Sequence, residues 1–394
     1  MSASGRAAFA AIAASALAAA VACNAPGAAA TARPLVVIVT PSEAVAPDEF
    51  RGAEAMVRSY SAQSAKGDIR HAILPEPKAG VASFIADAAS DPRVKALVVD
   101  PSPAGCAEGI RRAKRAKPGL IAIAGGSRED ELAIEASADL VVDLDRASRA
   151  YLIPWAAKKM GAKALVAAYS RGAEDDPAQV RERAIMSAAC ADLGLKYAAV
   201  TAPTGTDPVV YARAMTGAWL RDYGPDASLY CSDGALVAPL LAGSIAGGGI
   251  VVDEAGEATR AAYAAALGID LSPAKGDAAR ERRLLERALG AVGGRGRFGE
   301  WDAGYAGASV EGIAEFALRI VTGSARKDDL KAFVAALESR SPGAAWLASF
   351  DVDPDTGVRS ANRALLRQDV YVFGSGYLQT ALQNVPGKYL SLSN

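Results

Sequence analysis

The sequence predicts an α/β protein with two doubly wound parallel-sheet lobes in series, joined by a hinge that the chain crosses several times. Short runs of β-branched residues alternate with amphipathic segments from Pro34 to Asp145, and the alternation restarts at Lys163. Crossover helices on both faces of a parallel sheet bury its strands, which explains why these runs are so uniformly apolar. The chain has 394 residues, and this length favours two domains over one.

The first lobe is expected at residues 34–145. The apolar run PLVVIVTP forms its first strand, and residues 48–65 form a helix because apolar residues recur there at helical spacing. The alternation continues through IRHAIL, GVASFIADAAS, VKALVVD, GCAEGIRRAKRA, LIAIAGG, EDELAIEASA and DLVVDLD. This lobe therefore has five strands with helices between them.

The second lobe is expected at residues 146–298 and begins with a long helix at 147–160. It continues with the strand KALVAAYS, a helix at 177–193, the strand KYAAVTAP, a helix at 208–223, the strand ASLYCSD, the helix LVAPLLAGSIA and the strand GIVVDEA. Residues 299–394 contain a helix at 310–322 and a late strand, DVYVFG. We expect this returning segment to contribute to both lobes.

Residues 1–23 have the pattern of an export signal. Arg6 supplies a short positive region, residues 7–22 are apolar, and small residues precede Cys23. The apolar run is too short and too rich in alanine for a membrane span.

The segment AVAC, which ends at Cys23, resembles the lipobox of bacterial lipoproteins, with alanine where that motif usually has leucine. The resemblance implies a lipid on Cys23 that anchors the protein to a membrane. Residues 24–33 are rich in Ala, Pro, Gly and Thr and would then form a flexible tether. Ordinary signal cleavage without a lipid, or an apolar start that is not cleaved, is the alternative.

The charge and the scarcity of reactive side chains argue against several classes of function. The formal net charge of −1 gives no reason to expect binding to nucleic acid, which needs a clustered basic surface. His71 is the one histidine, so neither a zinc site nor a general base is supported. Cys106, Cys190 and Cys231 define no disulfide framework, and one pairing among them stays open. We expect no cofactor, no metal and no enzymatic activity.

Two short motifs resemble ligand-binding loops. GGRGRFGEW at 293–301 has glycines at dinucleotide-binding spacing, but a helix precedes it where that motif needs a strand, so we expect a mobile connection between the lobes. DVDPDTG at 351–357 begins like a calcium loop, but its glycine is displaced and Asn362 stands where the loop closes with glutamate. A turn is expected there, with calcium binding as the alternative.

An exported pair of α/β lobes resembles the type I periplasmic-binding-protein superfamily, whose members close two lobes around a small solute. More narrowly, a family of uncharacterised bacterial lipoproteins with that fold is similar in five segments: EFRGAEAMVRSY, ADLVVDLDRASRAYLIPWAAKKMGAK, CADLGLKYAAVTAPT, GRFGEW and DVYVFGSG. That family is a domain of unknown function, related in outline to basic-membrane-protein-type binding lipoproteins. The resemblance covers nearly the whole mature chain and implies this fold and a location in the periplasm or cell envelope, but no ligand.

Ligands of doubly wound sheets bind outside the C-terminal ends of the strands, where side chains converge. This rule selects candidate ligand contacts after the predicted strands: Thr40, Ser42, Asp100, Ser102, Gly126 and Ser127 in the first lobe, and Tyr169, Ser170, Arg171, Thr201, Ser232 and Asp233 in the second. Arg171 could hold an anion, and Tyr169 could offer an aromatic face. Asp145, where the chain leaves the first lobe, would contact ligand or hold the hinge. The same residue types also cap helices and form turns.

These patterns predict an exported, membrane-anchored binding protein that captures a small polar solute between its lobes. Its partner would be an ABC-type permease or a receptor. A ligand-sensing regulator with the same fold and an envelope enzyme are the alternatives. Regulators of this fold carry a helix-turn-helix before the first lobe, where this chain has the export pattern, and no catalytic motif supports an enzyme.

Overall fold

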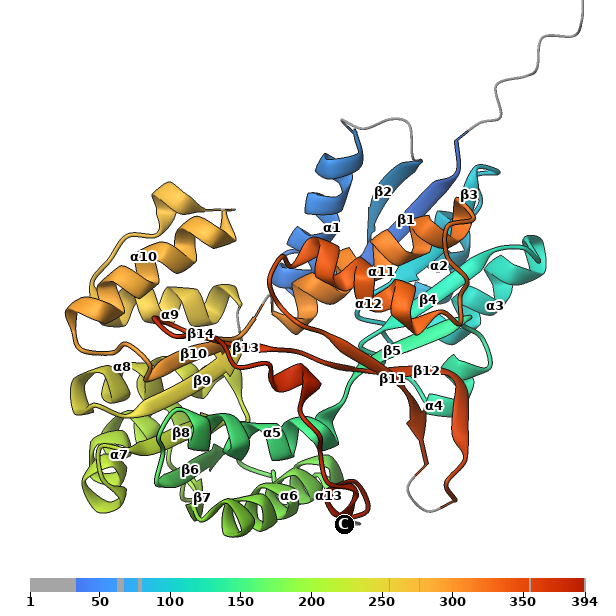
Figure 1. The fold of residues 1–394 in the computed structure, drawn as a ribbon. Helices are drawn as coiled ribbons and strands as arrows, with labels where there is room; N and C mark the ends of the chain where they lie inside the picture. The colour runs from blue at the N-terminus through green and yellow to red at the C-terminus, as the bar shows by residue number, and fades with distance from the viewer. Residues whose placement is uncertain are drawn as a thin grey trace, which may run out of the picture. The chain divides into compact units, whose positions relative to one another are not determined.

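The computed structural model describes residues 33–61, 67–76, 80–254, 256–275, 277–302, 304–353 and 356–392 (Figure 1). The export pattern, Cys23 and the tether up to residue 32 lie outside this part of the chain, so lipidation stays a prediction. Among the described helices, none has the length and apolar character that crossing a bilayer requires.

Within the described residues, the first lobe is built on a seven-stranded sheet with the order β11-β12-β5-β4-β3-β1-β2. Neighbouring strands pair in parallel, except that β11 and β12 pair antiparallel. The strands are β1 (Leu35–Thr40), β2 (Asp68–Ile73), β3 (Val94–Val99), β4 (Ile121–Gly125), β5 (Leu140–Leu144), β11 (Leu347–Val352) and β12 (Arg359–Arg367).

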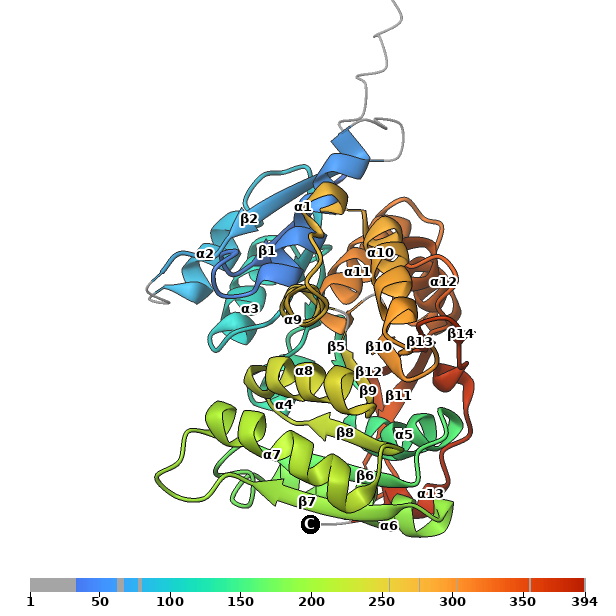
Figure 2. The ribbon, with the colours of Figure 1, turned by 90° about the vertical axis from the view of Figure 1, so that its left-hand side faces the viewer.

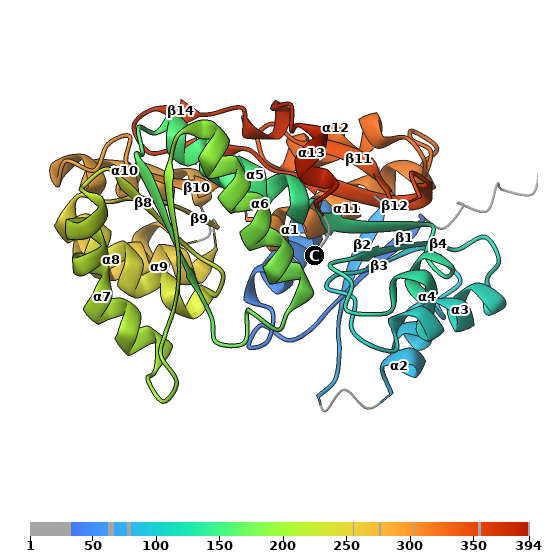
Figure 3. The same ribbon diagram turned by 90° about the horizontal axis from the view of Figure 1, so that it is seen from below.

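Helices cover both faces of this sheet. Because successive strand residues point to opposite faces, the buried strand β1 serves two hydrophobic cores. Val36 and Ile38 pack on the side of α1, α11 and α12, and Val37 and Val39 pack on the side of α2, α3 and α4 (Figure 3). The helices are α1 (Pro47–Ser61), α2 (Val81–Ala88), α3 (Cys106–Ala116), α4 (Glu131–Glu135), α11 (Tyr305–Val321) and α12 (Leu330–Arg340).

The second lobe repeats this plan, with the described strands in the order β14-β13-β10-β9-β8-β6-β7. Its strands are β6 (Ala164–Tyr169), β7 (Lys196–Thr201), β8 (Ala227–Cys231), β9 (Ile250–Glu254), β10 (Phe298–Trp301), β13 (Val370–Val372) and β14 (Gly376–Tyr377). Its helices are α5 (Arg146–Lys159), α6 (Pro177–Leu193), α7 (Pro208–Tyr223), α8 (Val237–Gly247), α9 (Glu257–Leu267), α10 (Ala278–Ala291) and α13 (Gly387–Leu390). Asp176 and Asp207 cap α6 and α7, and proline at the next position favours the start of each helix.

The segment GRFGEW differs from its prediction as a mobile connection. Its last four residues form β10, which pairs in parallel with β9 and antiparallel with β13. Phe298 and Trp301 are both buried. A side chain at Gly299 would place its Cβ 2.8 Å from the carbonyl oxygen of Tyr371, so glycine allows β13 to approach. Gly299, the last glycine of the motif that resembled a nucleotide-binding loop, therefore serves strand packing.

In the described residues the chain passes between the two sheets three times: from β5 to α5, from β10 to α11, and from β12 to β13. Hydrogen bonds join these crossings. The Asp145 carboxylate accepts from Arg367 Nε at 2.8 Å, and its backbone N–H donates to Leu366 O at 2.8 Å. The Asp302 N–H donates to Asp369 O at 2.9 Å. We call these three connections the hinge.

Candidate functional site

Thr40, at the end of β1, belongs to a buried polar network. Its exposed fraction is 0%, and its hydroxyl donates to Pro41 O at 2.7 Å. The same oxygen lies 2.8 Å from His71 Nε2, and His71 Nδ1 lies 2.8 Å from Glu54 Oε1 on α1. A hydroxyl, an imidazole and a carboxylate in this order are the parts of a nucleophilic relay. Because protein encloses the Thr40 hydroxyl, the network instead joins α1 to β1 and β2.

The serines predicted at this edge of the first lobe mainly support turns. Ser102 is buried, and its hydroxyl donates to Val99 O at 2.9 Å. The Ser127 N–H donates to Asp143 Oδ1 at 3.2 Å, directly after Gly126, whose φ is 50°. Ser42 is more open and donates to Glu76 Oε1 at 3.1 Å. The contacts of Ser102 and Ser127 are the turn roles that their residue types also allow, and the contact of Ser42 joins the loops that follow β1 and β2.

Asp100 lies beneath the same edge with an exposed fraction of 2%, and it accepts a hydrogen bond from Ser309 Oγ of α11 at 3.0 Å. Burial raises the pKa of Asp100 well above its usual value, and the neighbouring carboxyl groups of Glu49 and Asp143 raise it further. Burial also raises the pKa of Glu49 and of Asp143. A carboxyl group that keeps its proton can donate as well as accept hydrogen bonds.

Tyr169, predicted to offer its ring to a ligand, lies in the core of the second lobe with an exposed fraction of 1%. Its Oη lies 3.3 Å from Tyr197 Oη and 3.5 Å from Met186 Sδ, and the Arg183 guanidinium lies 5.0 Å from the ring centroid. The void that it borders measures about 10 Å³, which is room for about one water molecule. The ring therefore stabilises the core of this lobe.

Arg171 also bonds to protein in this structure. Its Nη2 donates to Pro203 O at 3.1 Å and to Thr206 O at 2.6 Å, so it joins the loops that follow β6 and β7. Ser232 Oγ accepts from the Ser170 N–H at 3.3 Å and links the ends of β6 and β8 in the same way. These contacts join the loops to one another at the edge of the sheet.

The remaining predicted contacts lie at the end of β7, after β8 and in the hinge. Thr201 is half-buried, and Asp233 caps the short 3-10 helix Gly234–Leu236. Asp145 caps α5 by accepting from the Ser148 N–H at 2.9 Å, besides its bond to Arg367. Asp145 therefore has hinge contacts, and its predicted contact with a ligand stays a prediction.

A cavity of about 570 Å³ lies between helices of the two lobes. This volume is within the range of about 300–1,000 Å³ that is common for small-molecule sites. α1 and α11 of the first lobe face α9 and α10 of the second across it, and these helices can be followed in Figure 2. The lining residues are Asp48, Arg51, Gly52, Ala55, Arg58, Arg260, Ala261, Ala264, Leu271, Ser272, Lys275, Ala278, Glu281, Gly307, Ala308, Glu311 and Arg340.

Small residues bring the helices of the first lobe together along the floor of this cavity. A Cβ at Gly52 of α1 would lie 2.7 Å from the carbonyl oxygen of Gly307 of α11, so any side chain there would force the helices apart. Ala55 and Ala308 continue the strip, and Ala264 lines the opposite wall. Among the described lining residues, small and charged side chains therefore predominate, with Leu271 as a large apolar member.

Charged side chains supply the polar contacts of the cavity. Arg260 Nη1 of α9 forms an ion pair with Glu281 Oε2 of α10 at 3.1 Å, and Arg340 Nε lies 3.5 Å from Glu311 Oε2. Burial raises the pKa of Glu311 to about 7, against the lowering effect of Arg340 and Arg58. Hydrogen bonds to ionised groups are stronger than neutral ones, so these side chains can orient a polar ligand.

None of the predicted ligand contacts lines this cavity. Those predictions came from the ends of strands, whereas the cavity lies along the outer faces of helices. A signal for it does exist in the sequence, because Asp48, Arg51, Ala55 and Arg58 share one face of α1 at spacings of three and four residues. The opposite face of α1 holds the apolar residues that predicted the helix.

Among the described residues, no group of three or more His, Cys, Asp or Glu side chains is arranged to hold a metal ion. In the segment DVDPDTG, Asp351 lies at the end of β11, and Asp353 accepts from the Thr356 N–H at 2.7 Å, which is a turn contact. Residues 354 and 355 of this segment lie outside the described residues, so the calcium alternative stays untested.

A family model described as "Protein of unknown function (DUF3798)" matches residues 35–299, and a second model, described only as a family, matches residues 310–392. An uncharacterised protein of Treponema pallidum (strain Nichols) is 32% identical over 215 residues, which is 53% of this chain and 97% of the relative.

Solved structures are similar in fold at lower sequence identity. A protein of Clostridium difficile 630, described as a candidate transcriptional regulator, has a TM-score of 0.77 at 18% identity, covering 87% of this chain and 99% of its own. An ABC transporter solute-binding protein of Burkholderia multivorans has a TM-score of 0.41 at 18% identity, covering 74% of this chain and 94% of its own. The two lobes and their three crossings have the type I periplasmic-binding-protein fold.

Proposed function

This chain belongs to the DUF3798 family of proteins of unknown function, so we propose a function from its own geometry: it captures a small polar solute between its two lobes without transforming it. The observation that carries this proposal is the cavity of about 570 Å³ lined by charged residues of both lobes. A ligand that contacts both lobes at once favours the closed arrangement over the open one.

The hinge supports this mechanism. Its hydrogen bonds join short connections, and the helices on either side of the cavity belong to different lobes, so a rotation at the hinge changes the width of the cavity. Hinge motions of this kind need changes at only a few residues between rigid bodies.

The proposal includes a place and a partner. The export pattern and the lipobox-like segment support a protein anchored through Cys23 outside the cytoplasm, which delivers its solute to an ABC-type permease or a receptor. Palmitate labelling of the intact chain, with Cys23→Ser as the control, tests the anchor. Absence of label on the unsubstituted protein would rule out a lipid anchor on Cys23.

A ligand-sensing role is the second candidate. It is favoured by the Clostridium difficile structure, which has the same fold and is described as a candidate transcriptional regulator. In that role the closed lobes would present a surface to a signalling partner, and the solute would stay bound instead of being handed to a permease.

The test of solute capture is a thermal-shift and calorimetric screen of the purified full-length chain against a panel of amino acids, nucleosides, sugars and carboxylates. A solute that binds only the folded state raises the melting temperature. Ala264→Phe fills the cavity wall and should weaken binding at least tenfold. Ala265→Phe, on an exposed neighbouring position of α9, should leave it unchanged. If the affinity for the solute is unchanged in Ala264→Phe, the solute binds outside this cavity.

A further inference from the structure

The cavity between the lobes carries basic groups on both of its walls. Arg51 and Arg58 of α1 and Arg340 of α12 belong to the first lobe, and Arg260 of α9 and Lys275 belong to the second. The described lining also contains three acidic residues, Asp48, Glu281 and Glu311. The basic groups therefore outnumber the acidic ones among the described lining residues, and they face one another across the space between the lobes.

A carboxylate orients Arg260 and leaves some of its N–H donors for another partner. Its Nη1 pairs with Glu281 Oε2 at 3.1 Å, and Glu281 is buried with an exposed fraction of 8%. A guanidinium has five N–H donors in a planar fork, so one ion pair orients it and leaves donors for another partner. Lys275, which is exposed and lines the same cavity, adds a second positive charge from the same lobe.

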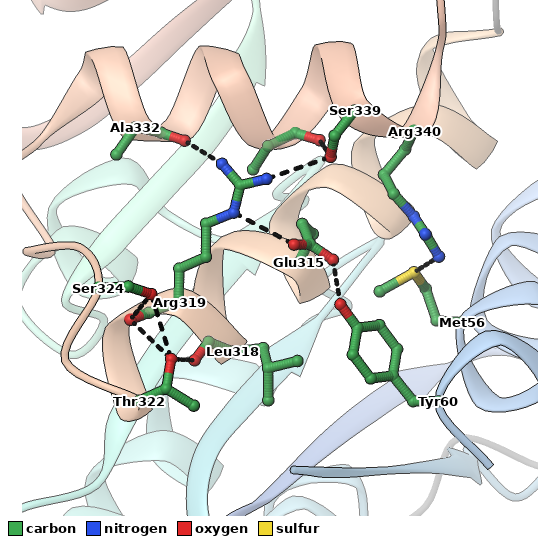
Figure 4. A network of polar contacts seen from close by, with 11 residues as sticks. Met56, Tyr60, Glu315, Leu318, Arg319, Thr322, Ser324, Ala332, Ser339 and Arg340 are labelled. Carbon is green, nitrogen blue, oxygen red and sulfur yellow. Dashed lines mark hydrogen bonds and ion pairs between the residues drawn. The ribbon is translucent and has the colours of Figure 1, made fainter. Parts of the chain in front are cut away.

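Arg340 is fixed in a comparable way on the other wall. Its Nη2 lies 2.6 Å from Met56 Sδ of α1, and its Nε lies 3.5 Å from Glu311 Oε2 of α11. The side chain thus lies across the three helices of this wall, beside Met56, as Figure 4 shows. The Arg340 side chain lines the cavity and keeps 18% of its surface exposed, and its Nη1 has no part in these two contacts.

A separate network holds the three helices of that wall together. Tyr60 of α1 donates to the carboxylate of Glu315 on α11, which also accepts from Arg319 Nε at 3.1 Å. Arg319 then reaches α12, where its Nη2 donates to Ser339 Oγ at 3.3 Å (Figure 4). This network makes the wall a rigid support for Arg340. Because these side chains are already ordered, little further side-chain entropy is lost when a ligand binds.

We propose that the solute of this cavity is a small anion that carries a phosphate or carboxylate group, held by Arg340 of the first lobe and by Arg260 and Lys275 of the second. This inference rests on the proposed function and names the class of its ligand. Planar guanidinium groups match the paired oxygen atoms of carboxylates and phosphates, so arginine on both walls suits such a ligand.

The same charges explain how the ligand would close the lobes. Basic groups on opposite walls repel one another when only solvent lies between them, and this repulsion favours a wider cavity. An anion between the walls attracts the basic groups of both walls, so the net electrostatic interaction across the gap becomes attractive. The ligand then contributes to closure through each lobe at once.

The test is calorimetric titration of the full-length chain with two probes, inorganic phosphate and succinate, at low ionic strength. We expect at least one of them to bind, and affinity to fall as NaCl is added. Arg260→Gln combined with Lys275→Gln should weaken binding at least tenfold. Lys275→Gln alone, at an exposed position, should weaken it by a smaller factor without affecting folding. Arg283→Gln, which removes an exposed positive charge from α10 outside the cavity, is the matched control.

The outcomes separate the two proposals. Failure of both anions to bind, or equal binding to the double variant and the wild type, would overturn the anion assignment. If a neutral solute of the panel then binds and Ala264→Phe blocks it, capture between the lobes stands with a different ligand class. If nothing in the panel binds, both the anion assignment and the proposal of solute capture fail.

Discussion

Glu311 is a carboxylic acid placed where its charged form is poorly solvated. It lies on α11, and it faces Arg340 of α12 and Arg58 of α1, while Arg260 and Lys275 line the opposite wall. Burial outweighs the attraction of the nearby arginines and raises its pKa to about 7. Near neutral pH this residue therefore changes the charge of the cavity.

The pH dependence of stability tests this environment. A raised pKa in the folded state means that Glu311 favours folding below the pKa of an ordinary glutamate, and that this contribution is lost as the pH rises through about 7. Glu311→Gln is neutral throughout. The free energy of unfolding of the wild type, relative to the variant, should fall by roughly 2–3 kcal/mol between pH 4 and 8.

Chemical denaturation across this pH range provides the measurement. Glu338→Gln, at an exposed position of the neighbouring helix α12, is the control and should follow the wild type. Parallel stability profiles for the wild type and Glu311→Gln would show that Glu311 is solvated like a surface residue.

For some single residues, the sequence predicted the position in the fold but not the contacts of the side chain. Asp100, Ser102 and Tyr169 do lie at strand ends, as expected, but their polar atoms bond to the protein around them. A sequence identifies residues able to contact a ligand, yet it does not tell which of them the fold uses internally. That choice depends on long-range neighbours such as Ser309, which is 209 positions from Asp100.

Among the secondary-structure elements, most of the parallel strands were predictable because they are short, mainly apolar runs between helical segments. β10 was missed, since it is short and contains glycine, and its burial comes from pairing with β13 near the end of the chain. β11 and β12 were also missed. Their residues are partly exposed and polar, and Arg363 of β12 pairs with Asp143 of β5 at 3.1 Å, a contact that only the folded sheet provides.

Gly299→Ala tests the packing of β10. The added Cβ would lie 2.8 Å from the backbone oxygen of Tyr371, which cannot move without disturbing the pairing of β10 with β13. We expect a loss of about 1–3 kcal/mol in the free energy of unfolding, measured by urea denaturation. Gly119→Ala is the control, because an added Cβ there meets no atom within 4 Å. Equal stability of the two variants would contradict the described strand pairing.

For the whole of the described chain, two lobes could be anticipated from the repeated alternation of strands and helices, and several crossings from the segment that follows the second lobe, but not their number. The cavity could not, because it is formed by faces of α1, α9, α10 and α11 that meet only after both lobes have folded. The sequence predicts which face of a helix is apolar. Which residues lie opposite its polar face depends on the relative orientation of the two lobes, which the crossings determine.

In the proposed function, a solute bound between the lobes draws them together. The most direct test is the distance between spin labels at Arg287→Cys on α10 and Glu338→Cys on α12, two exposed positions on helices that contribute to the cavity lining. Cys23 and the partly exposed Cys231 are replaced by serine so that the labels attach only at these two positions. We predict a shorter distance when the tightest-binding solute of the screen is added at saturation, and no change when Ala264→Phe is also present. A distance distribution that stays the same at saturation would contradict the account.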